Sequence, residues 1–507
     1  MKGKRIISAL LSLTILLPAL SALGGCASKK EVTLRVYNWE EYIDEGGEGS
    51  YEYDYEINED GSAPPILDDF EEWYEETYGK SVRVEYSTFG TNEDLYNQLK
   101  LGDKYDLVCP SEYMIMKLAA EGMIQPLDTA QLDIYNANVS DYIAEIFKKT
   151  PAVAGEPLEK YAAGYMWGVT GLVYNPEQVN EETLNESGWK IMLDPAYKNK
   201  VTTKDNVRDS YFVGLGIHYR EELLALKKQN ENGELSDGEY TDRVTELMNR
   251  TDEESVKKVT EILKTMKSNI FGFETDTGKS DMVKGTISMN FAWSGDAVYA
   301  MDQAEEEEVF LNFHIPEECA NLFFDGWVMP KDEKRDKDTE LAALAFINFM
   351  SRPDNAVRNS YYIGYTSVIA GEEMLDYARD LYSAEDEENA VPYDVSYFFR
   401  RGDEDKSAYI INAPAEQLSR QLYAQFPPAD TVKRCAVMGY YGEAEEAINE
   451  LWTQVKGEQL SAWAIVVICA AVVAIVLFIV FTKFGHRIEF RMKPKKGYRL
   501  VKQEKLK

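Results

Sequence analysis

Five places in the sequence set aromatic side chains and carboxylates close together at the ends of probable strands, and these residue types could bind a cation. They are Trp39-Glu40-Glu41-Tyr42, Ser111-Glu112-Tyr113, Asp205–Asp209, Trp293 and Phe323-Phe324-Asp325. Carboxylates pair with ammonium groups, and ring faces cover methylenes while attracting partly desolvated cations. The set therefore suits an elongated organic polycation. For any single pair the alternative is a core ring beside a solvated acid, because both are common in proteins.

Patterns for other chemistry are missing from the sequence. It contains no Ser nucleophile elbow, P-loop, zinc-type His pair or CxxC, and its three histidines lie far apart. Lys+Arg 54 against Asp+Glu 88 leaves a net charge of −34, which would repel the phosphates of nucleic acid. We therefore expect no catalytic residue, no metal, no cofactor and no nucleic-acid partner. A hydrolase with Glu41 and Asp325 as paired carboxylates is the alternative from another class, but cation binding needs no further assumption.

The elements that would position these residues alternate between strand and helix. The predicted strands are Thr33–Tyr37, Val82–Tyr86 and Tyr105–Cys109. The predicted helices that alternate with them are Leu67–Tyr78, Asn92–Leu101 and a helix capped by Ser111 that runs through Glu121. This alternation favours an α/β fold with helices layered on a mainly parallel sheet. In open sheets of this kind, ligands bind beyond the carboxyl ends of the strands, where the five motifs can converge.

Two hydrophilic stretches interrupt this pattern. Ile43–Pro65 is acidic and contains several Gly and Tyr residues, and Glu221–Glu254 carries dense Lys and Glu at spacings that suit exposed helices. Neither stretch carries recognisable chemistry. Both are therefore predicted to be solvated surface.

The first 25 residues have the layout of a secretory signal. A basic segment at 2–5 precedes the apolar run Ile6–Leu20. The motif Leu23-Gly24-Gly25-Cys26 resembles the lipobox of bacterial lipoproteins, which implies cleavage before Cys26 and a lipid on its thiol. The alternative is an uncleaved anchor with an incidental cysteine, although apolar regions this short rarely span a bilayer.

The C-terminal end predicts a membrane span. Ala462–Phe481 is a run of twenty apolar residues without a charge, and it would form about 30 Å of helix. Ten Lys/Arg follow within Lys483–Lys507, and the positive-inside rule puts such a tail in the cytoplasm. We therefore expect a transmembrane helix at 462–482, a cytoplasmic tail at 483–507, and an extracytoplasmic part between the two anchors.

Three of the five cysteines lie between the anchors. They are Cys109, Cys319 and Cys435. An odd number allows at most one disulfide and requires none.

Six segments between the anchors form a recognisable series. They are Leu34–Tyr42, Tyr105–Tyr113, Glu121–Gln125, Tyr165–Gly168, Ile347–Asp354 and Ile363–Tyr365. Together they resemble bacterial spermidine/putrescine-binding proteins, which are solute-binding lipoproteins of ABC transporters. The first segment carries the family's Tyr-Asn-Trp-x-Glu-Tyr signature. The resemblance covers roughly residues 31–456.

The resemblance implies a two-lobed periplasmic-binding-protein fold of the type II-like form, which closes on a polyamine. Lobe one would consist of 31–167 plus 326–372, and lobe two of 172–324 plus 373–456. The chain would cross between the lobes at Trp167–Gly171 and at Leu322–Gly326.

The resemblance also implies a set of ligand-binding residues. The positions that match the family's contacts are Trp39, Glu41, Tyr42, Ser111, Tyr113, Asp205, Asp209, Trp293, Phe323, Asp325 and Tyr365. Glu41 would accept a hydrogen bond from an amine, and Asp209 would bind an inner or terminal amine. Asp325 would clamp one terminal ammonium group. The aromatic residues would line the cleft.

Three positions depart from the family's pattern, one of which is Met438, near the C-terminus, where the family has glutamine. A second carboxylate falls at Asp205 only if one residue is inserted, and otherwise Asn206 lies there. Phe323 stands where the family has Trp, which keeps a ring face but loses the indole donor. The preference between spermidine and putrescine therefore stays open.

These observations lead to a membrane-held, monomeric polyamine-binding lipoprotein that delivers its ligand to an ABC permease. One alternative keeps the fold but changes the solute to an amino acid, a sugar or iron. A sugar site would need fewer carboxylates, and iron would favour paired Tyr with His or Asp. The other alternative is a sensor ectodomain that signals through Ala462–Phe481.

Overall fold

A computed structural model of the chain describes residues 31–47, 50–51, 62–153, 155–275, 277–386 and 389–457. The predicted signal segment, Cys26, the apolar run at 462–481 and the basic tail lie outside these residues. Among the helices described, none combines the length and the hydrophobicity that crossing a bilayer requires. The chain divides into a first unit that ends at Trp452 and a second unit that begins at Thr453. The elements described below belong to the first unit, except that α20 (Glu445–Lys456) continues past Trp452.

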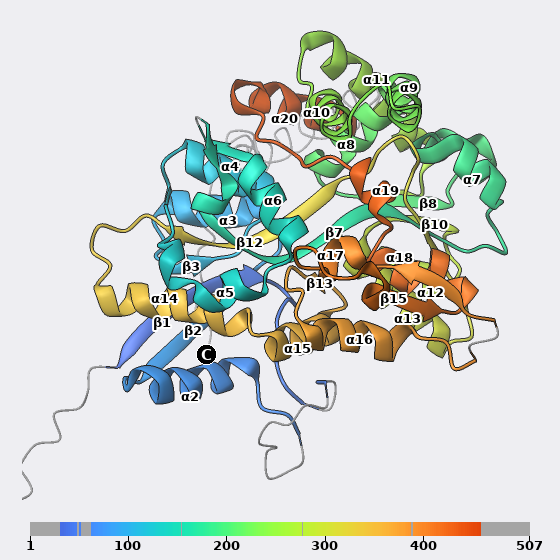
Figure 1. Cartoon of the computed structure of the whole chain (residues 1–507). Helices are drawn as coiled ribbons and strands as arrows, with labels where there is room; N and C mark the ends of the chain where they lie inside the picture. The colour runs from blue at the N-terminus through green and yellow to red at the C-terminus, as the bar shows by residue number, and fades with distance from the viewer. Residues whose placement is uncertain are drawn as a thin grey trace, which may run out of the picture. The chain divides into compact units, whose positions relative to one another are not determined.

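One large mixed sheet runs through this unit (Figure 1). Its main path is β2-β1-β3-β12-β7-β10-β8-β9, with β4 paired to β12 and with β11 and β13 paired to β7. The strands in chain order are β1 (Val32–Trp39), β2 (Val82–Phe89), β3 (Leu107–Val108), β4 (Ile124–Gln125), β7 (Ala162–Tyr174), β8 (Val201–Lys204), β9 (Gly272–Glu274), β10 (Met289–Trp293), β11 (Asn312–His314), β12 (Leu322–Pro330) and β13 (Thr366–Ser367). Two small hairpins stand apart from the sheet, β5 (Pro151–Val153) with β6 (Glu156–Pro157) and β14 (Val391–Asp394) with β15 (Ile410–Ala413).

The prediction of a mainly parallel sheet is correct for the two arms and wrong for the centre. β1 runs parallel to β2 and β3, and β8 runs parallel to β9 and β10. β7 is antiparallel to each of its partners, and so is β12. Both central strands are buried along their whole length. A strand buried on both faces reads as a continuous apolar run, so its pattern does not indicate its direction.

β7 changes its partner part-way along, and this joins the two halves of the fold. Its residues from Ala162 to Val169 pair with β12, and those from Thr170 to Tyr174 pair with β10. The segments 167–171 and 322–326, where the sequence predicts the crossings between lobes, lie in β7 and β12. The two predicted crossings therefore run side by side as hydrogen-bonded strands.

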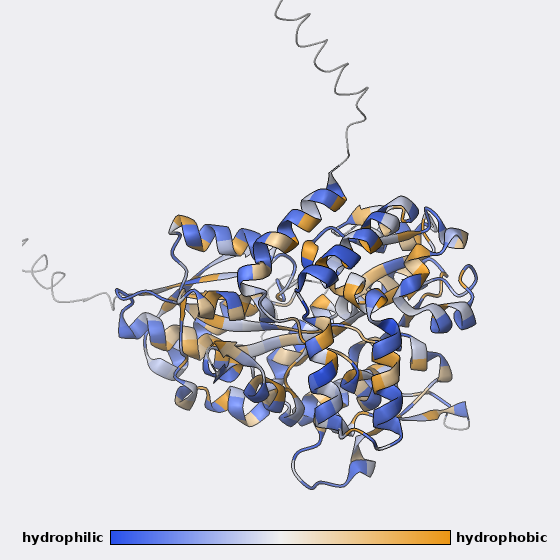
Figure 2. Cartoon of the chain, turned by 90° about the horizontal axis from the view of Figure 1, so that it is seen from above, coloured by the Kyte–Doolittle hydropathy of each residue, from blue (hydrophilic) through white to orange (hydrophobic). Residues whose placement is uncertain are grey.

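Helices lie on most of the segments between the strands of the sheet. Those before β10 are α2 (Ile66–Tyr78), α3 (Asn92–Leu101), α4 (Glu112–Ala120), α5 (Asp133–Asn138), α6 (Asp141–Lys149), α7 (Glu181–Ser187), α8 (Val207–His218), α9 (Arg220–Glu231), α10 (Asp237–Met248), α11 (Glu253–Asn269) and α12 (Gly278–Val283). The later ones are α13 (Ser294–Glu306), α14 (Lys337–Met350), α15 (Pro353–Ile363), α16 (Glu372–Tyr382), α17 (Ser396–Phe399), α18 (Gln421–Gln425), α19 (Ala429–Lys433) and α20. Figure 2 shows orange, hydrophobic segments alternating with blue, hydrophilic ones along these helices, as expected for helices with one buried face.

The elements predicted near the N-terminus are confirmed, with β3 shorter than expected. The reasons are local. In α2, Ile66, Phe70 and Tyr74 recur every four residues and are buried, while acidic residues fill the other faces. In α3, the hydroxyl of Thr91 accepts a hydrogen bond from the Asp94 amide at the N-terminus.

The stretch at 43–65 is anchored at both ends, so the prediction of solvated surface is wrong there. Asp44 is fully buried and accepts hydrogen bonds from Arg358 and Ser50. Arg358 also donates to Asp69 in α2 and to the carbonyl of Pro64. Residues 52–61 lie outside the described part. The ends of this stretch are thus tied to α15 and α2 by a buried ion-pair network.

The stretch at 221–254 forms the helices that its charge spacing predicts, but they are not wholly solvated. Leu223 and Leu226 of α9 and Tyr240 and Val244 of α10 are buried. The helices therefore pack one apolar face against the rest of the unit.

The three cysteines of the described part are free and buried. Burial raises the pKa of the Cys435 thiol to about 11 and holds the pKa values of Cys109 and Cys319 well above their usual range. These thiols are therefore protonated and unreactive at neutral pH.

Candidate functional site

Asp325 lies at the centre of the candidate site, in the interior of β12. The pairing of β12 with β7 shifts register between Asp325 and Gly326, and such irregularities re-aim side chains. The carboxylate is buried and accepts two hydrogen bonds, from Ser111 Oγ at 2.7 Å and from Tyr42 OH at 2.8 Å. The three residues are far apart in sequence, so only the fold brings them together.

The electrostatic state of Asp325 is unusual for a buried acid. Burial raises its pKa from 3.8 to about 6, although the hydroxyls of Ser111 and Tyr42 favour its charged form. Among the described residues, no Lys or Arg forms an ion pair with this carboxylate or lowers its pKa. At neutral pH Asp325 is therefore a buried negative charge held by hydroxyl groups, and a cation would be its natural partner.

Trp39 and Tyr42 reach the site from the end of β1. The ring of Trp39 packs on Phe89, with centroids 4.6 Å apart. Its buried indole N–H lies close enough to Asp325 to favour the charged carboxylate, although its geometry is not that of a hydrogen bond. Between the two aromatic residues the chain turns at Glu41, whose φ of 52° is left-handed. The carbonyl of Tyr42 then accepts a hydrogen bond from Tyr165 OH at 2.9 Å, which holds the turn in place.

Ser111 and Tyr113 are positioned by Asn92, a buried residue that the sequence analysis did not single out. The Asn92 amide group donates to Ser111 Oγ at 3.1 Å and to Tyr113 OH at 3.0 Å, and its oxygen accepts from the Ser111 amide. Ser111 does stand at the N-terminus of α4, as predicted, but its hydroxyl does not cap the helix. It is directed to Asp325 instead.

Asp209 forms a second acidic group, in the first turn of α8. Its carboxylate accepts a hydrogen bond of 2.6 Å from Asn206, whose oxygen in turn caps the helix at the Asp209 amide. Burial raises the pKa of Asp209 to about 6, against the opposing effects of Asn206, Lys204 and Arg208. Asn206, and not Asp205, is therefore the neighbour of this carboxylate.

Trp293 and Lys204 lie beside Asp209, at the ends of two paired strands. Trp293 is the last residue of β10, and its indole favours the charged form of Asp209. Lys204 is the last residue of β8, and its Nζ lies 4.4 Å from the centroid of the Trp293 ring. The wall residue predicted at 293 thus already has a cation from the chain on its ring.

Tyr365 lies between the Asp325 cluster and Asp296 in α13. Its ring packs on Tyr42 at 5.0 Å and on Phe323 at 6.2 Å between centroids. Its hydroxyl donates to Asp296 at 3.2 Å. Tyr365 therefore reaches from the Asp325 cluster to the start of α13, next to Trp293.

Two predicted site residues are not part of this arrangement. Glu41 is exposed at the left-handed turn, and Asp205 is exposed at the end of β8. The remaining predicted residues are linked through the contacts described above. Spacing along the chain could not separate Glu41 from Tyr42, because a turn of one residue decides which side chain faces inward.

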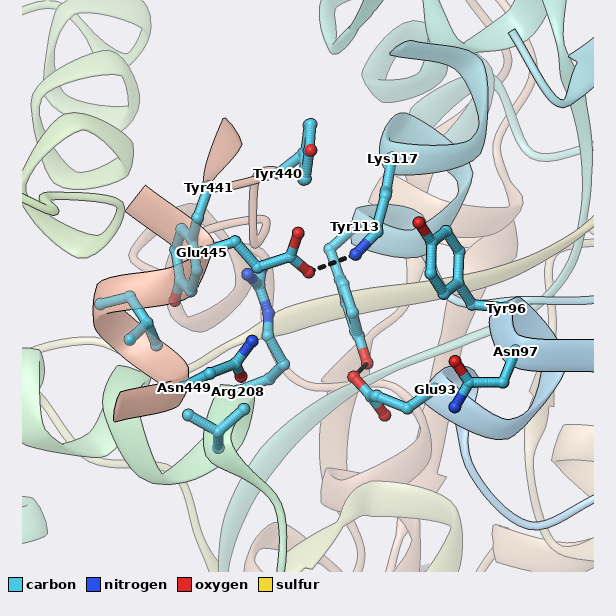
Figure 3. Close-up of a pocket in the computed structure, with 12 residues that line it drawn as sticks. Glu93, Tyr96, Asn97, Tyr113, Lys117, Arg208, Tyr440, Tyr441, Glu445 and Asn449 are labelled. Atoms are coloured by element: carbon cyan, nitrogen blue, oxygen red, sulfur yellow. Dashed lines mark hydrogen bonds and ion pairs between the residues drawn. The ribbon is translucent and has the colours of Figure 1, made fainter. Parts of the chain in front are cut away.

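A pocket of about 210 Å³ opens next to Tyr113 (Figure 3). Its lining residues are Glu93, Tyr96, Asn97, Tyr113, Lys117, Val207, Arg208, Tyr440, Tyr441, Glu445, Ile448 and Asn449. Arg208 lies between two rings, with its guanidinium carbon 4.2 Å from the Tyr113 centroid and 3.7 Å from the Tyr441 centroid. On the other side, Lys117 pairs with Glu445, as the dashed line in Figure 3 marks. The pocket therefore adjoins the Asp325 and Asp209 groups through Tyr113 and Arg208.

Glu112 is a further buried acid that the sequence analysis did not select as a site residue. It accepts a hydrogen bond from the Phe324 amide at 3.2 Å, next to Asp325 in the chain. Burial raises its pKa to about 8, and the nearby Asp325 charge adds to this. Glu112 is therefore mostly uncharged at neutral pH. No sequence signal marks it beyond its place in the motif Ser111-Glu112-Tyr113.

A family model described as a bacterial extracellular solute-binding protein matches residues 66–380. The chain belongs to this family. Relatives include the spermidine/putrescine-binding periplasmic protein of Salmonella typhimurium (strain LT2), 27% identical over 346 residues that cover 68% of this chain and 80% of the relative. The putrescine-binding periplasmic protein PotF of Escherichia coli (strain K12) is 27% identical over 375 residues, which cover 73% of this chain and 85% of the relative.

Solved structures of the same class share the fold. A putative spermidine/putrescine ABC transporter protein from Listeria monocytogenes aligns with a TM-score of 0.54 at 23% identity, covering 84% of this chain and 98% of that one. A spermidine/putrescine substrate-binding protein from Streptococcus pneumoniae aligns with a TM-score of 0.52. The chain therefore has the two-lobed periplasmic-binding-protein fold with mixed α/β content, as predicted.

Proposed function

We propose that the chain binds a polyamine on the extracytoplasmic side of a membrane and delivers it to an ABC permease. The observation that carries the proposal is Asp325, a buried carboxylate without a cationic partner among the described residues. Trp39 and Tyr42 lie beside this carboxylate, and Phe323 packs on Tyr365, whose ring packs on Tyr42. A ligand ammonium would supply the missing charge, and the rings would cover its methylenes.

The relatives support the choice of a polyamine over other solutes. Both curated relatives named above are called putrescine- or spermidine/putrescine-binding proteins. A sugar would use amide and hydroxyl donors and would leave the charge of Asp325 unpaired. The proposal is of a binding protein rather than an enzyme, since family members bind solutes.

Binding of the purified full-length chain to spermidine, putrescine, an amino acid and a sugar tests this proposal. Isothermal titration calorimetry should give heats that saturate for at least one of the two polyamines and no saturable heat for the sugar. Saturable binding of the amino acid or sugar, with no binding of either polyamine, would show that the site serves another solute.

The membrane attachment belongs to the same proposal and rests on the sequence. We place a lipid on Cys26, a transmembrane helix at 462–482 and the tail at 483–507 in the cytoplasm, with the binding lobes as a monomer outside. The intact mass of the wild type should be that of a chain that begins at a lipidated Cys26, whereas the Cys26→Ser variant should carry no lipid. Protease added to intact cells should remove the lobes and spare the tail. Digestion of the tail without permeabilisation would show that the orientation is wrong.

A further inference from the structure

Lys204 is an ammonium group of the chain itself that is held in the manner of a bound amine. Its side chain is 1% exposed. Its Nζ donates to the carbonyl of Thr275 at 2.9 Å and to Asp296 Oδ2 at 3.2 Å, and it lies 3.6 Å from Glu274 Oε1. The face of the Trp293 ring lies 4.4 Å away. Two carboxylates, a carbonyl and a ring face are the groups that would bind one end of an organic cation.

This resident ammonium lies in the same site as Asp325. Lys204 binds Asp296, Asp296 accepts a hydrogen bond from Tyr365, and Tyr365 packs on Tyr42, which donates to Asp325. Lys204 also favours the charged form of Asp209. Its charge therefore acts on Asp209, one of the two buried acids on which a polyamine would depend.

The charges at the Lys204 end of the site are already balanced. The carboxylates there are Asp209, Glu274 and Asp296. The cations near them are Lys204, Arg208 and Lys279, the last at 3.7 Å from Asp296. At the other end Asp325 has no such partner among the described residues. Glu112 adds little charge there, because its pKa is about 8.

We infer that Lys204 sets the ligand class of this site, so that it prefers a diamine such as putrescine over a triamine such as spermidine. The inference rests on the proposed function. A diamine can place one ammonium group on Asp325 and share Asp209 with the resident cations. The additional ammonium group of a triamine would find Glu274 and Asp296 already occupied by Lys204 and would be repelled by it.

Titration of the full-length chain with putrescine and spermidine, before and after Lys204→Met, tests the inference. The wild type should bind putrescine about tenfold or more tightly than spermidine, given the repulsion between like charges in a buried site. Lys204→Met keeps the length of the side chain but frees Glu274 and Asp296 for a ligand. It should reduce the ratio of the two dissociation constants at least fivefold, mainly by improving spermidine binding.

Two further variants complete the test. Lys204→Arg keeps the positive charge and should keep the preference for putrescine. Lys80→Met removes the same charge from an exposed pair with Asp338 and should leave the ratio unchanged. Circular dichroism establishes whether Lys204→Met folds, and if it does not, Lys204→Gln, which also removes the charge but keeps a hydrogen-bond donor, takes its place.

The outcomes separate this inference from the proposed function. If the wild type binds the two polyamines within threefold of each other, Lys204 does not set the class, although the chain is still a polyamine binder. If folded Lys204→Met keeps the wild-type ratio, the inference fails in the same way. If the wild type binds neither polyamine, the proposed function itself is wrong.

Discussion

Replacing Asp325 by Asn should abolish tight polyamine binding and at the same time stabilise the ligand-free protein. The carboxylate is buried and lacks a cationic partner among the described residues, so a bound ammonium would form an ion pair with it out of contact with water. Removing one member of such a pair costs about 2–5 kcal/mol. This corresponds to a loss of about 30-fold to several thousand-fold in affinity.

The expected gain in stability follows from the pKa of the same group. A carboxyl group whose pKa rises from 3.8 to about 6 on folding binds protons more readily in the folded state. The free energy of unfolding therefore falls as pH rises through this range, and the full loss is present at pH 7. A shift of about two units corresponds to a loss of at most about 3 kcal/mol. Asn cannot ionise, and its amide can still bond to the Ser111 and Tyr42 hydroxyls, so the variant should avoid this loss.

Two measurements check the prediction. Calorimetric titration with putrescine and spermidine reports the affinity, and urea unfolding at pH 7 and pH 4.5 without ligand reports the stability. The stability gain should be present at pH 7 and smaller at pH 4.5, where wild-type Asp325 is already protonated. Asp103→Asn, at an exposed position, serves as the control and should change neither quantity. If Asp325→Asn binds both polyamines within twofold of the wild type, Asp325 does not hold the ligand and the reasoning about the site is wrong.

Three other predictions follow from named contacts. Affinity for putrescine should fall about tenfold per carboxylate between pH 7.5 and pH 5, because Asp325 and Asp209 have pKa values of about 6 and only their charged forms attract an amine. An affinity that stays constant over this pH range would contradict the assignment of these two carboxylates to the ligand. Asn92→Ala should weaken binding about five- to thirtyfold, with an unchanged circular dichroism spectrum, because it releases the hydroxyls of Ser111 and Tyr113. An affinity equal to that of the wild type would show that these hydrogen bonds do not position the site. Arg358→Met should lower the free energy of unfolding by about 3–5 kcal/mol, because it leaves Asp44 charged and buried; a change below 1 kcal/mol in urea unfolding would mean that the network is not a stabilising anchor.

The sequence alone determined the local elements and the kind of site. β1 and α2 form where alternation and helical spacing predict them, and α3 forms where the sequence predicts a helix, because these signals involve only neighbours in the chain. Aromatic residues next to carboxylates indicated a cation site, because the types of these residues limit the chemistry that they can perform. The resemblance to a known family supplied the positions, from Trp39 to Tyr365.

Tertiary structure alone decided which of those side chains face one another. Ser111 has the composition and place of a helix cap, yet its hydroxyl bonds to Asp325, 214 residues later in the chain. No sequence pattern singles out Lys204, yet it is buried against Trp293 and Asp296. The direction of β7 and β12 is likewise invisible in their sequences, because both strands are buried along their whole length and show no alternation of polar and apolar residues. Burial, partners and strand direction depend on contacts between distant segments, and the free energy of each contact is set by surroundings that no local pattern contains.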